Sequence, residues 1–238
     1  MYLKFIKSIR KITPLGDWDG SNAVILRHDV DFDIEHAYQL ALIEAESDVR
    51  STFFILTSCT TYNPLSASNR KKLYEMAKMG FEIGLHFDPT LYGDVDEAQL
   101  KAFVDQEARI VSCITGVSVK SVSLHNPSIH GKYPLFDGYN NTYDRRIFSD
   151  ASYLSDSRMD FRGKNPFTFV KKVKDCPIQI LLHPVHYSEK GLAYPDIFYE
   201  HIKRYTDAID NSFRVNSTYE AQISSMGLFS YIINKGAR

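Results

Sequence analysis

Residues that can transfer protons or bind metal ions stand at the ends of several apolar runs in this sequence. They are Asp29 and Asp31, His86 and Asp88, His125, Asp156, and His183 with His186. Parallel strands joined by helices bring their carboxyl ends to one edge of a sheet, where catalytic sites are built. We therefore expect these side chains to converge on one small volume and to form a candidate site there.

Asp29 and Asp31 are two residues apart, so on a strand both side chains project from the same face. Two carboxylates this close repel each other. A divalent cation bound by one relieves the repulsion and leaves the other ionised as a general base. The alternative is a pair of turn or cap carboxylates, although Asp33 is better placed to cap the next helix. His28 points to the opposite face, where a supporting hydrogen bond is expected.

His86 lies in a segment whose apolar and other residues alternate. The same two-residue spacing puts Glu82, Gly84, His86 and Asp88 on one face of a strand, and apolar residues occupy the other face. His86 therefore faces away from the apolar side. For the isolated histidines we expect ordinary core or surface roles; they are His36, His130 and His201.

Apolar runs of strand length alternate with stretches of helical period, which predicts an α/β fold with a largely parallel sheet. Strands are expected over 23–32, 51–57, 81–87, 121–126, 151–156 and 178–187. Helices are expected near 34–47, 68–79, 94–115 and 196–211. Gly80 has the place of a helix C-terminal glycine. The segment 127–143 is irregular, and a loop of this length in a compact domain is often functional.

The overall composition is that of a soluble globular domain. The 238 residues are 44% hydrophobic, and 28 basic residues balance 29 acidic ones. This balance gives no broad attraction for nucleic acid, so nucleic acid is not an expected partner. No linker composition divides the chain, which predicts one domain over 1–238. The basic, apolar first residues predict a short amphipathic helix rather than a signal peptide, and no bilayer-spanning run follows. Three widely spaced cysteines suggest free thiols, so we expect a cytoplasmic location.

Four short motifs, taken in order, resemble those of a known family. They are RHDVD at 27–31, TFF at 52–54, EIGLH at 82–86 and LLHP at 181–184. The set resembles the polysaccharide deacetylases of the NodB-homology type, carbohydrate esterase family 4, over residues 22–187. The resemblance implies a single irregular (β/α) barrel of about seven strands, NodB-like, with its site at the strand carboxyl ends. It also implies metal-dependent removal of the N-acetyl group of a sugar.

The resemblance also implies roles for individual residues. Asp29 corresponds to the general base, Asp31 and His86 to metal ligands, and His183 to the general acid. The segment YLSDSR at 153–158 loosely resembles a further motif, whose aspartate orients the catalytic histidine; here that residue is Asp156. His186 is placed to line the pocket.

Two departures from the family pattern affect the expected site. The family usually has a histidine or aspartate four residues after the first metal-binding histidine, where this chain has Thr90, a poor ligand. Asp88 and His125 are the possible replacements. We choose His125, because Asp31, His86 and His125 together suit zinc or a similar divalent ion. The family's arginine-proline motif is also missing, and Arg27, on the same strand face as Asp29, is a possible substitute.

Together with the expected cytoplasmic location, the resemblance implies an enzyme whose substrate is an N-acetylated sugar, a precursor in surface polysaccharide biosynthesis. Two alternatives stay open. The first is a catalytically inactive sugar-binding or scaffold domain of the same fold. The second is another metal-dependent hydrolase, a phosphoesterase or an amidohydrolase. Barrels of that second class typically carry two histidines around one residue on the first strand, where this chain has Asp-Val-Asp. The oligomeric state is not predicted.

Overall fold

The computed structural model of the chain describes residues 2–188 and 191–236. Its internal contacts group into two compact units, Met1–Ser188 and Glu189–Arg238. The region of family resemblance, 22–187, lies within the first unit. Compact units need not fold separately, so the single domain expected over 1–238 stays a prediction.

The first unit is built on one parallel sheet that curls into a half-barrel. In the described residues its strands follow the order β6-β5-β4-β3-β2-β8-β7, and β1 pairs with the amino end of β2. This arrangement confirms the predicted irregular barrel of about seven strands. The strands are β1 Ile12–Thr13, β2 Val24–Val30, β3 Thr52–Leu56, β4 Glu82–Phe87, β5 Ser121–Leu124, β6 Asn140–Asn141, β7 Tyr153–Ser155 and β8 Ile178–Leu182.

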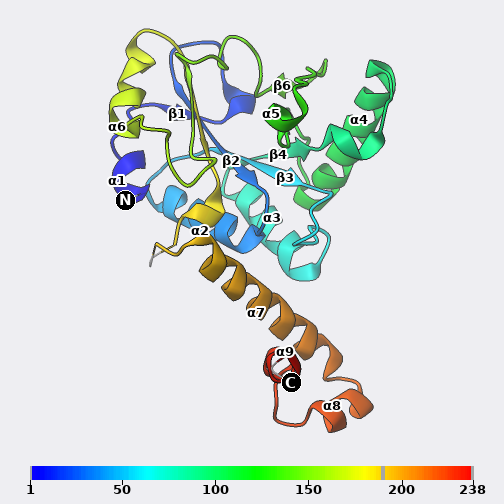
Figure 1. Cartoon of the computed structure of the whole chain (residues 1–238). Helices are drawn as coiled ribbons and strands as arrows, with labels where there is room; N and C mark the ends of the chain where they lie inside the picture. The colour runs from blue at the N-terminus through cyan, green and yellow to red at the C-terminus, as the bar shows by residue number, and fades with distance from the viewer. Residues whose placement is uncertain (1, 189–190, 237–238) are drawn as a thin grey trace. The chain divides into compact units, whose positions relative to one another are not determined.

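Three helices, α2 (Ile34–Glu46), α3 (Ala67–Lys78) and α4 (Glu97–Thr115), pack against the outer side of β2–β4 (Figure 1). The Asp33 side chain caps α2 by accepting a hydrogen bond from the backbone N–H of Glu35, as expected. The shorter helices of this unit are α1 Tyr2–Ile6, α5 Pro127–His130 and α6 Pro166–Phe169, and the 3-10 turns are η1 Leu15–Asp17, η2 Pro89–Tyr92, η3 Val170–Lys174 and η4 Pro184–His186.

The two faces of β4 meet different surroundings, as the alternation predicts. Ile83, Leu85 and Phe87 are buried in the core beneath the helices. Gly84 faces the inside of the half-barrel, where a Cβ atom would lie 2.6 Å from the Phe54 ring. Glycine therefore lets Phe54 cross over β4 and fill the interior, while His86, on the same inward face, reaches the carboxyl edge of the sheet.

Several predicted boundaries differ from the structure. The strand expected over 178–187 ends at Leu182, because Pro184 begins a 3-10 turn and cannot donate to the sheet ladder. The strand expected over 121–126 ends at Leu124. The two-residue strands β1 and β6 are too short to leave a periodic pattern.

The second unit contains α7 (Tyr194–Phe213), α8 (Ser217–Ile223) and α9 (Leu228–Gly236). The helix expected over 196–211 corresponds to α7, and α8 and α9 are additional. Asp210 joins α7 to α8 by accepting hydrogen bonds from Arg214 and Tyr219. Among the described residues, no helix is both long and apolar enough to cross a membrane.

Candidate active site

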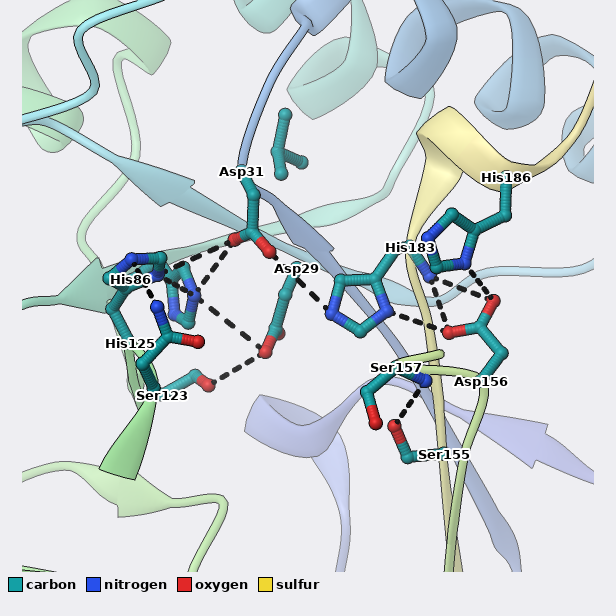
Figure 2. Close-up of polar contacts among 12 residues, drawn as sticks. Asp29, Asp31, His86, Ser123, His125, Ser155, Asp156, Ser157, His183 and His186 are labelled. Atoms are coloured by element: carbon teal, nitrogen blue, oxygen red, sulfur yellow. Dashed lines mark hydrogen bonds and ion pairs between the residues drawn. The ribbon is translucent and has the colours of Figure 1, made fainter. Parts of the chain in front are cut away.

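The carboxylate of Asp31 lies at the centre of the polar cluster drawn in Figure 2. One of its oxygens, Oδ1, faces His86 and His125, and the other, Oδ2, lies 3.6 Å from Nε2 of His183. These side chains come from the carboxyl ends of β2, β4, β5 and β8, four strands well separated in sequence. The predicted convergence at this edge of the sheet is therefore present.

Asp31, His86 and His125 form a compact group of three possible metal ligands. His86 Nε2 is 3.1 Å from Asp31 Oδ1, His125 Nδ1 is 3.3 Å from His86 Nε2, and His125 Nδ1 is 3.7 Å from Asp31 Oδ1. A tetrahedral ion with bonds of about 2.0–2.2 Å holds its ligand atoms about 3.3–3.6 Å apart. The three separations lie close to this range, so the group could hold a divalent metal ion.

The charge of the site also favours a cation. Burial raises the pKa of Asp31, but hydrogen bonds from His125 and His86 outweigh it and hold that pKa well below its usual range. Asp31 is therefore an anion at neutral pH. His86 is almost fully buried, and its second ring nitrogen, Nδ1, has no hydrogen-bond partner within the described part of the chain.

The carboxylate of Asp29 is buried beside this group and is held through one oxygen only. Its Oδ2 accepts hydrogen bonds from Arg27 Nη2 at 3.1 Å and from Ser123 Oγ at 3.3 Å. Among residues 2–188 and 191–236, Asp29 Oδ1 has no hydrogen-bond partner. Asp29 is therefore fixed in position through Oδ2, while Oδ1 is left without a hydrogen-bond partner among these residues.

The guanidinium of Arg27 is fully buried beneath the site, where it must be paired to be tolerated. Besides Asp29, it donates to Gln179 Oε1 at 3.3 Å and lies 5.3 Å from the centre of the Tyr143 ring. The rings of Phe54 and Tyr153 lie at 5.9 Å from it. Burial lowers the pKa of Arg27, but the charge of Asp29, helped by Tyr143 and Tyr153, outweighs burial and raises that pKa above its usual value. Arg27 thus supplies a permanent positive charge next to Asp29.

The carboxylate of Asp156 holds two imidazoles on the other side of Asp31. Its oxygens lie 2.7 Å from His183 Nδ1 and 3.1 Å from His186 Nδ1. Burial lowers the pKa of His183, but the hydrogen bond and charge of Asp156, helped by Asp31 and Asp29, raise it to about 9. His183 is therefore protonated at neutral pH, with Nε2 directed toward Asp31.

Asp156, His183 and His186 also satisfy the spacing of a possible metal group. Two details favour hydrogen bonding instead. The 2.7 Å separation between Asp156 and His183 is shorter than the roughly 3.3 Å that a tetrahedral ion imposes. The same carboxylate also accepts the backbone N–H of His183. Burial raises the pKa of Asp156, but the bonds from His183 and His186 outweigh it and hold that pKa at about 2.

Two predicted residues lie apart from the metal group. Asp88, the alternative third ligand, accepts hydrogen bonds from the backbone and the hydroxyl of Thr90, and its side chain caps η2. His28 lies on the opposite face of β2, as predicted, where its Nε2 is 2.7 Å from Glu44 Oε1. The structure thus brings His125, and not Asp88, to Asp31 and His86.

Four residues near the site were not predicted. Ser123 lies two residues before His125, so the alternation that placed His125 could also have placed Ser123 on the inward face. Tyr143 and Gln179 come from distant parts of the chain and enclose Arg27. Tyr143 ends the irregular segment 127–143, but no local pattern places either residue beside Arg27. The amide nitrogen of Asn126 lies 2.9 Å from His125 Nε2, and the strand alternation does not predict this contact either.

The chain matches no protein-family model and no curated protein sequence. Its fold is similar to several solved structures at low sequence identity. One is the chitin deacetylase from the fungal pathogen Colletotrichum lindemuthianum, at 18% identity and a TM-score of 0.48 over 81% of this chain and 86% of that one. Another is the peptidoglycan deacetylase of Bacillus subtilis, at 18% identity and a TM-score of 0.45 over 80% and 85%.

A third is a family 4 pseudoenzyme from Bacillus anthracis, at 13% identity and a TM-score of 0.45 over 77% of this chain and 62% of that one. A mutant of that pseudoenzyme has restored enzymatic activity, and this chain spans 64% of the mutant's length. These structures share carbohydrate esterase family 4, and it is to proteins of that family that this chain is structurally similar.

Proposed function

We propose that this protein is a metal-dependent deacetylase that hydrolyses the N-acetyl group of a sugar. One arrangement carries the proposal. The group Asp31, His86 and His125 has a carboxylate on one side, Asp29, and a protonated imidazole on the other, His183. Hydrolysis of an amide needs a base for the attacking water and an acid for the departing amine, so both requirements are met around one centre.

Asp31, His86 and His125 would hold the divalent ion. When bound there, the ion polarises the acyl carbonyl and lowers the pKa of a water molecule. Zinc is the ion we propose, because one carboxylate and two imidazoles with open positions are typical of catalytic zinc sites.

The proton transfers belong to residues of this chain. Asp29 takes a proton from the attacking water through its open oxygen, Oδ1, while Arg27 and Ser123 keep Oδ2 in place. The water oxygen bonds to the carbonyl carbon, and the carbon–nitrogen bond breaks. His183 gives the proton on Nε2 to the departing nitrogen, and Asp156 on Nδ1 keeps the ring oriented. The products are acetate and a free amino sugar.

The substrate we propose is an N-acetylated sugar precursor of surface polysaccharide, linked to a nucleotide or a lipid carrier. This finer step rests on the motif resemblance and on the expected cytoplasmic location, where an assembled wall polymer would be out of reach. Acetate release should therefore be faster from a nucleotide-linked N-acetyl sugar than from an N-acetylated oligosaccharide of a wall polymer. Activity on the assembled polymer alone would contradict this choice of substrate and leave the reaction type standing.

The reaction is tested by acetate release from zinc-loaded protein, with bound zinc measured in the same samples. We expect Asp29→Asn and His183→Ala to keep zinc and to lose at least about 100-fold in kcat, because each removes one proton transfer. His86→Ala should lose zinc and activity together. The matched control is His201→Ala, a histidine of α7 with no proposed role, which should change neither quantity.

The same experiment separates the enzyme from an inactive sugar-binding or scaffold domain. Such a domain would bind little zinc, and Asp29→Asn would have no effect beyond stability. An active protein whose turnover survives both Asp29→Asn and His183→Ala would overturn the roles given to this pair. Release of phosphate rather than acetate from suitable esters would instead favour the phosphoesterase alternative.

A further inference from the structure

Asn126 has an unusual place directly after His125 and before α5. Its backbone is left-handed, with φ of 47° and ψ of 39°, a conformation that asparagine tolerates better than most residues. It is the N-cap residue of α5, yet its side chain makes no capping hydrogen bond. Its amide nitrogen, Nδ2, instead lies 2.9 Å from Nε2 of His125.

A second Asn-Pro pair in the same unit shows what such an asparagine does otherwise. Asn165 precedes Pro166 at the start of α6, a helix as short as α5. Its side chain accepts hydrogen bonds from the backbone N–H groups of Phe167 and Thr168, as an N-cap asparagine normally does. Asn126 gives up this bond, so its contact with His125 needs an explanation other than helix capping.

His125 is the member of the metal group that most needs such a contact. Its side chain is 20% exposed, against 2% for His86, whose rotamer is fixed by packing on all sides. The backbone of His125 is held by a hydrogen bond to Phe87, but that bond leaves the ring free to turn. A partner on the outer nitrogen of the ring would fix its orientation.

The chemistry of a metal-binding imidazole defines what this partner must be. His125 faces Asp31 and His86 through Nδ1, so a lone pair must be on Nδ1 for the ring to bind an ion. The proton of the neutral ring is then on Nε2, which must donate. In the structure the amide nitrogen of Asn126 faces Nε2. The two ends of an amide have nearly the same shape, so a half-turn of the amide brings its oxygen, Oδ1, to the same place, where it can accept this hydrogen bond.

We propose that Asn126 is a positioning residue of the metal site, which accepts a hydrogen bond from Nε2–H of His125 and so holds its Nδ1 lone pair toward the ion. The inference rests on the proposed function, because it takes His125 as a ligand. It goes further by assigning this asparagine a role in metal affinity rather than in helix formation.

The test is the zinc dissociation constant, measured by equilibrium dialysis in a chelator buffer for wild type, Asn126→Gly and Asn126→Asp. Glycine keeps the left-handed backbone but removes the acceptor, and loss of such an outer partner typically weakens metal binding about 10–100-fold. Aspartate keeps an acceptor and is a stronger one, so Asn126→Asp should bind zinc at least as tightly as wild type. Nitrogen NMR of zinc-loaded wild type should show the His125 proton on Nε2.

Two controls make the failures distinguishable. Asn165→Gly removes a true N-cap side chain and should leave zinc affinity unchanged, while both glycine variants are checked for folding by thermal melting. If His125→Ala weakens zinc binding and Asn126→Gly does not, the role of Asn126 is overturned and the ligand stands. Equal weakening in Asn126→Gly and Asn126→Asp overturns it as well. If His125→Ala itself binds zinc like wild type, the proposed metal site fails.

Discussion

The carboxylate of Asp156 contacts two histidines, His183 and His186. Its negative charge beside His183 favours the protonated form of that ring. In the metal-free protein, the pKa of His183 is raised from 6.5 to about 9. The folded state therefore favours the protonated ring. This stabilisation is fully present below pH 6.5, the pKa of the His183 side chain in the unfolded chain. It is lost as the pH rises through about 9, the pKa of His183 in the folded protein.

We predict that Asp156→Asn lowers the pKa of His183, because burial is then opposed only by the weaker effects of Asp31 and Asp29. The measurement is an NMR titration of the His183 ring protons in metal-free wild type and variant. An unchanged pKa in the variant would mean that Asp156 does not hold the proton on His183. Circular dichroism at neutral pH serves as the control that both proteins remain folded.

For individual residues, the sequence could predict which face of a strand each side chain occupies, because side chains alternate between the two faces with a period of two residues. It placed Arg27 beside Asp29 and His28 on the opposite face, and both placements are confirmed by their contacts. It could not predict that Tyr143 and Gln179 would enclose Arg27, because those contacts join segments more than a hundred residues apart. The roles assigned to these residues stay predictions.

The elements of the half-barrel depend on how closely neighbouring strands approach inside it. Gly84 on β4 leaves room for the Phe54 ring of β3, and a Cβ there would also lie 3.0 Å from the backbone oxygen of Ser121. We predict that Gly84→Ala lowers the free energy of unfolding by about 1–3 kcal/mol, the usual cost of overpacking a core. Urea denaturation of wild type and variant measures this difference.

The double variant Gly84→Ala with Phe54→Leu is the control for this prediction. A smaller side chain at position 54 removes the ring contact but not the contact with the Ser121 backbone, so stability should recover only in part. A Gly84→Ala protein as stable as wild type would show that the inside of the half-barrel is loosely packed.

The sequence predicted which helices and strands exist where their hydrophobic pattern is long, but it predicted their first and last residues less well. The alternation over 81–87 gave β4 to within a residue, and the glycine at position 80 has the positive φ, 89°, expected just after α3. In contrast, the strand predicted over 178–187 ends at Leu182, because Pro184 begins η4. The apolar residues on both sides of Pro184 made the strand look longer. The helices α5 and α6 have four residues each, so they leave no helical period in the sequence, and their formation depends on tertiary packing.

The whole molecule consists of two compact units, and the candidate site lies in the first of them, Met1–Ser188. The hydrogen bonds and ion pairs described for Asp29, Asp31, His86, His125, Asp156 and His183 all join residues of Met1–Ser188. This unit also has its own apolar core on both faces of the sheet. Both the metal group and the fold that positions it are therefore contained in the first 188 residues.

We predict that a chain ending after Ser188 folds and binds zinc with the affinity of the full chain. The reason is that metal affinity is set by the ligands and their immediate partners, and these all precede that residue. Equilibrium dialysis with zinc, together with a thermal melt of each protein, checks the prediction. A shortened chain that melts cooperatively but binds zinc more weakly would mean that Glu189–Arg238 contributes to the site. One that fails to fold would support the single domain predicted over 1–238.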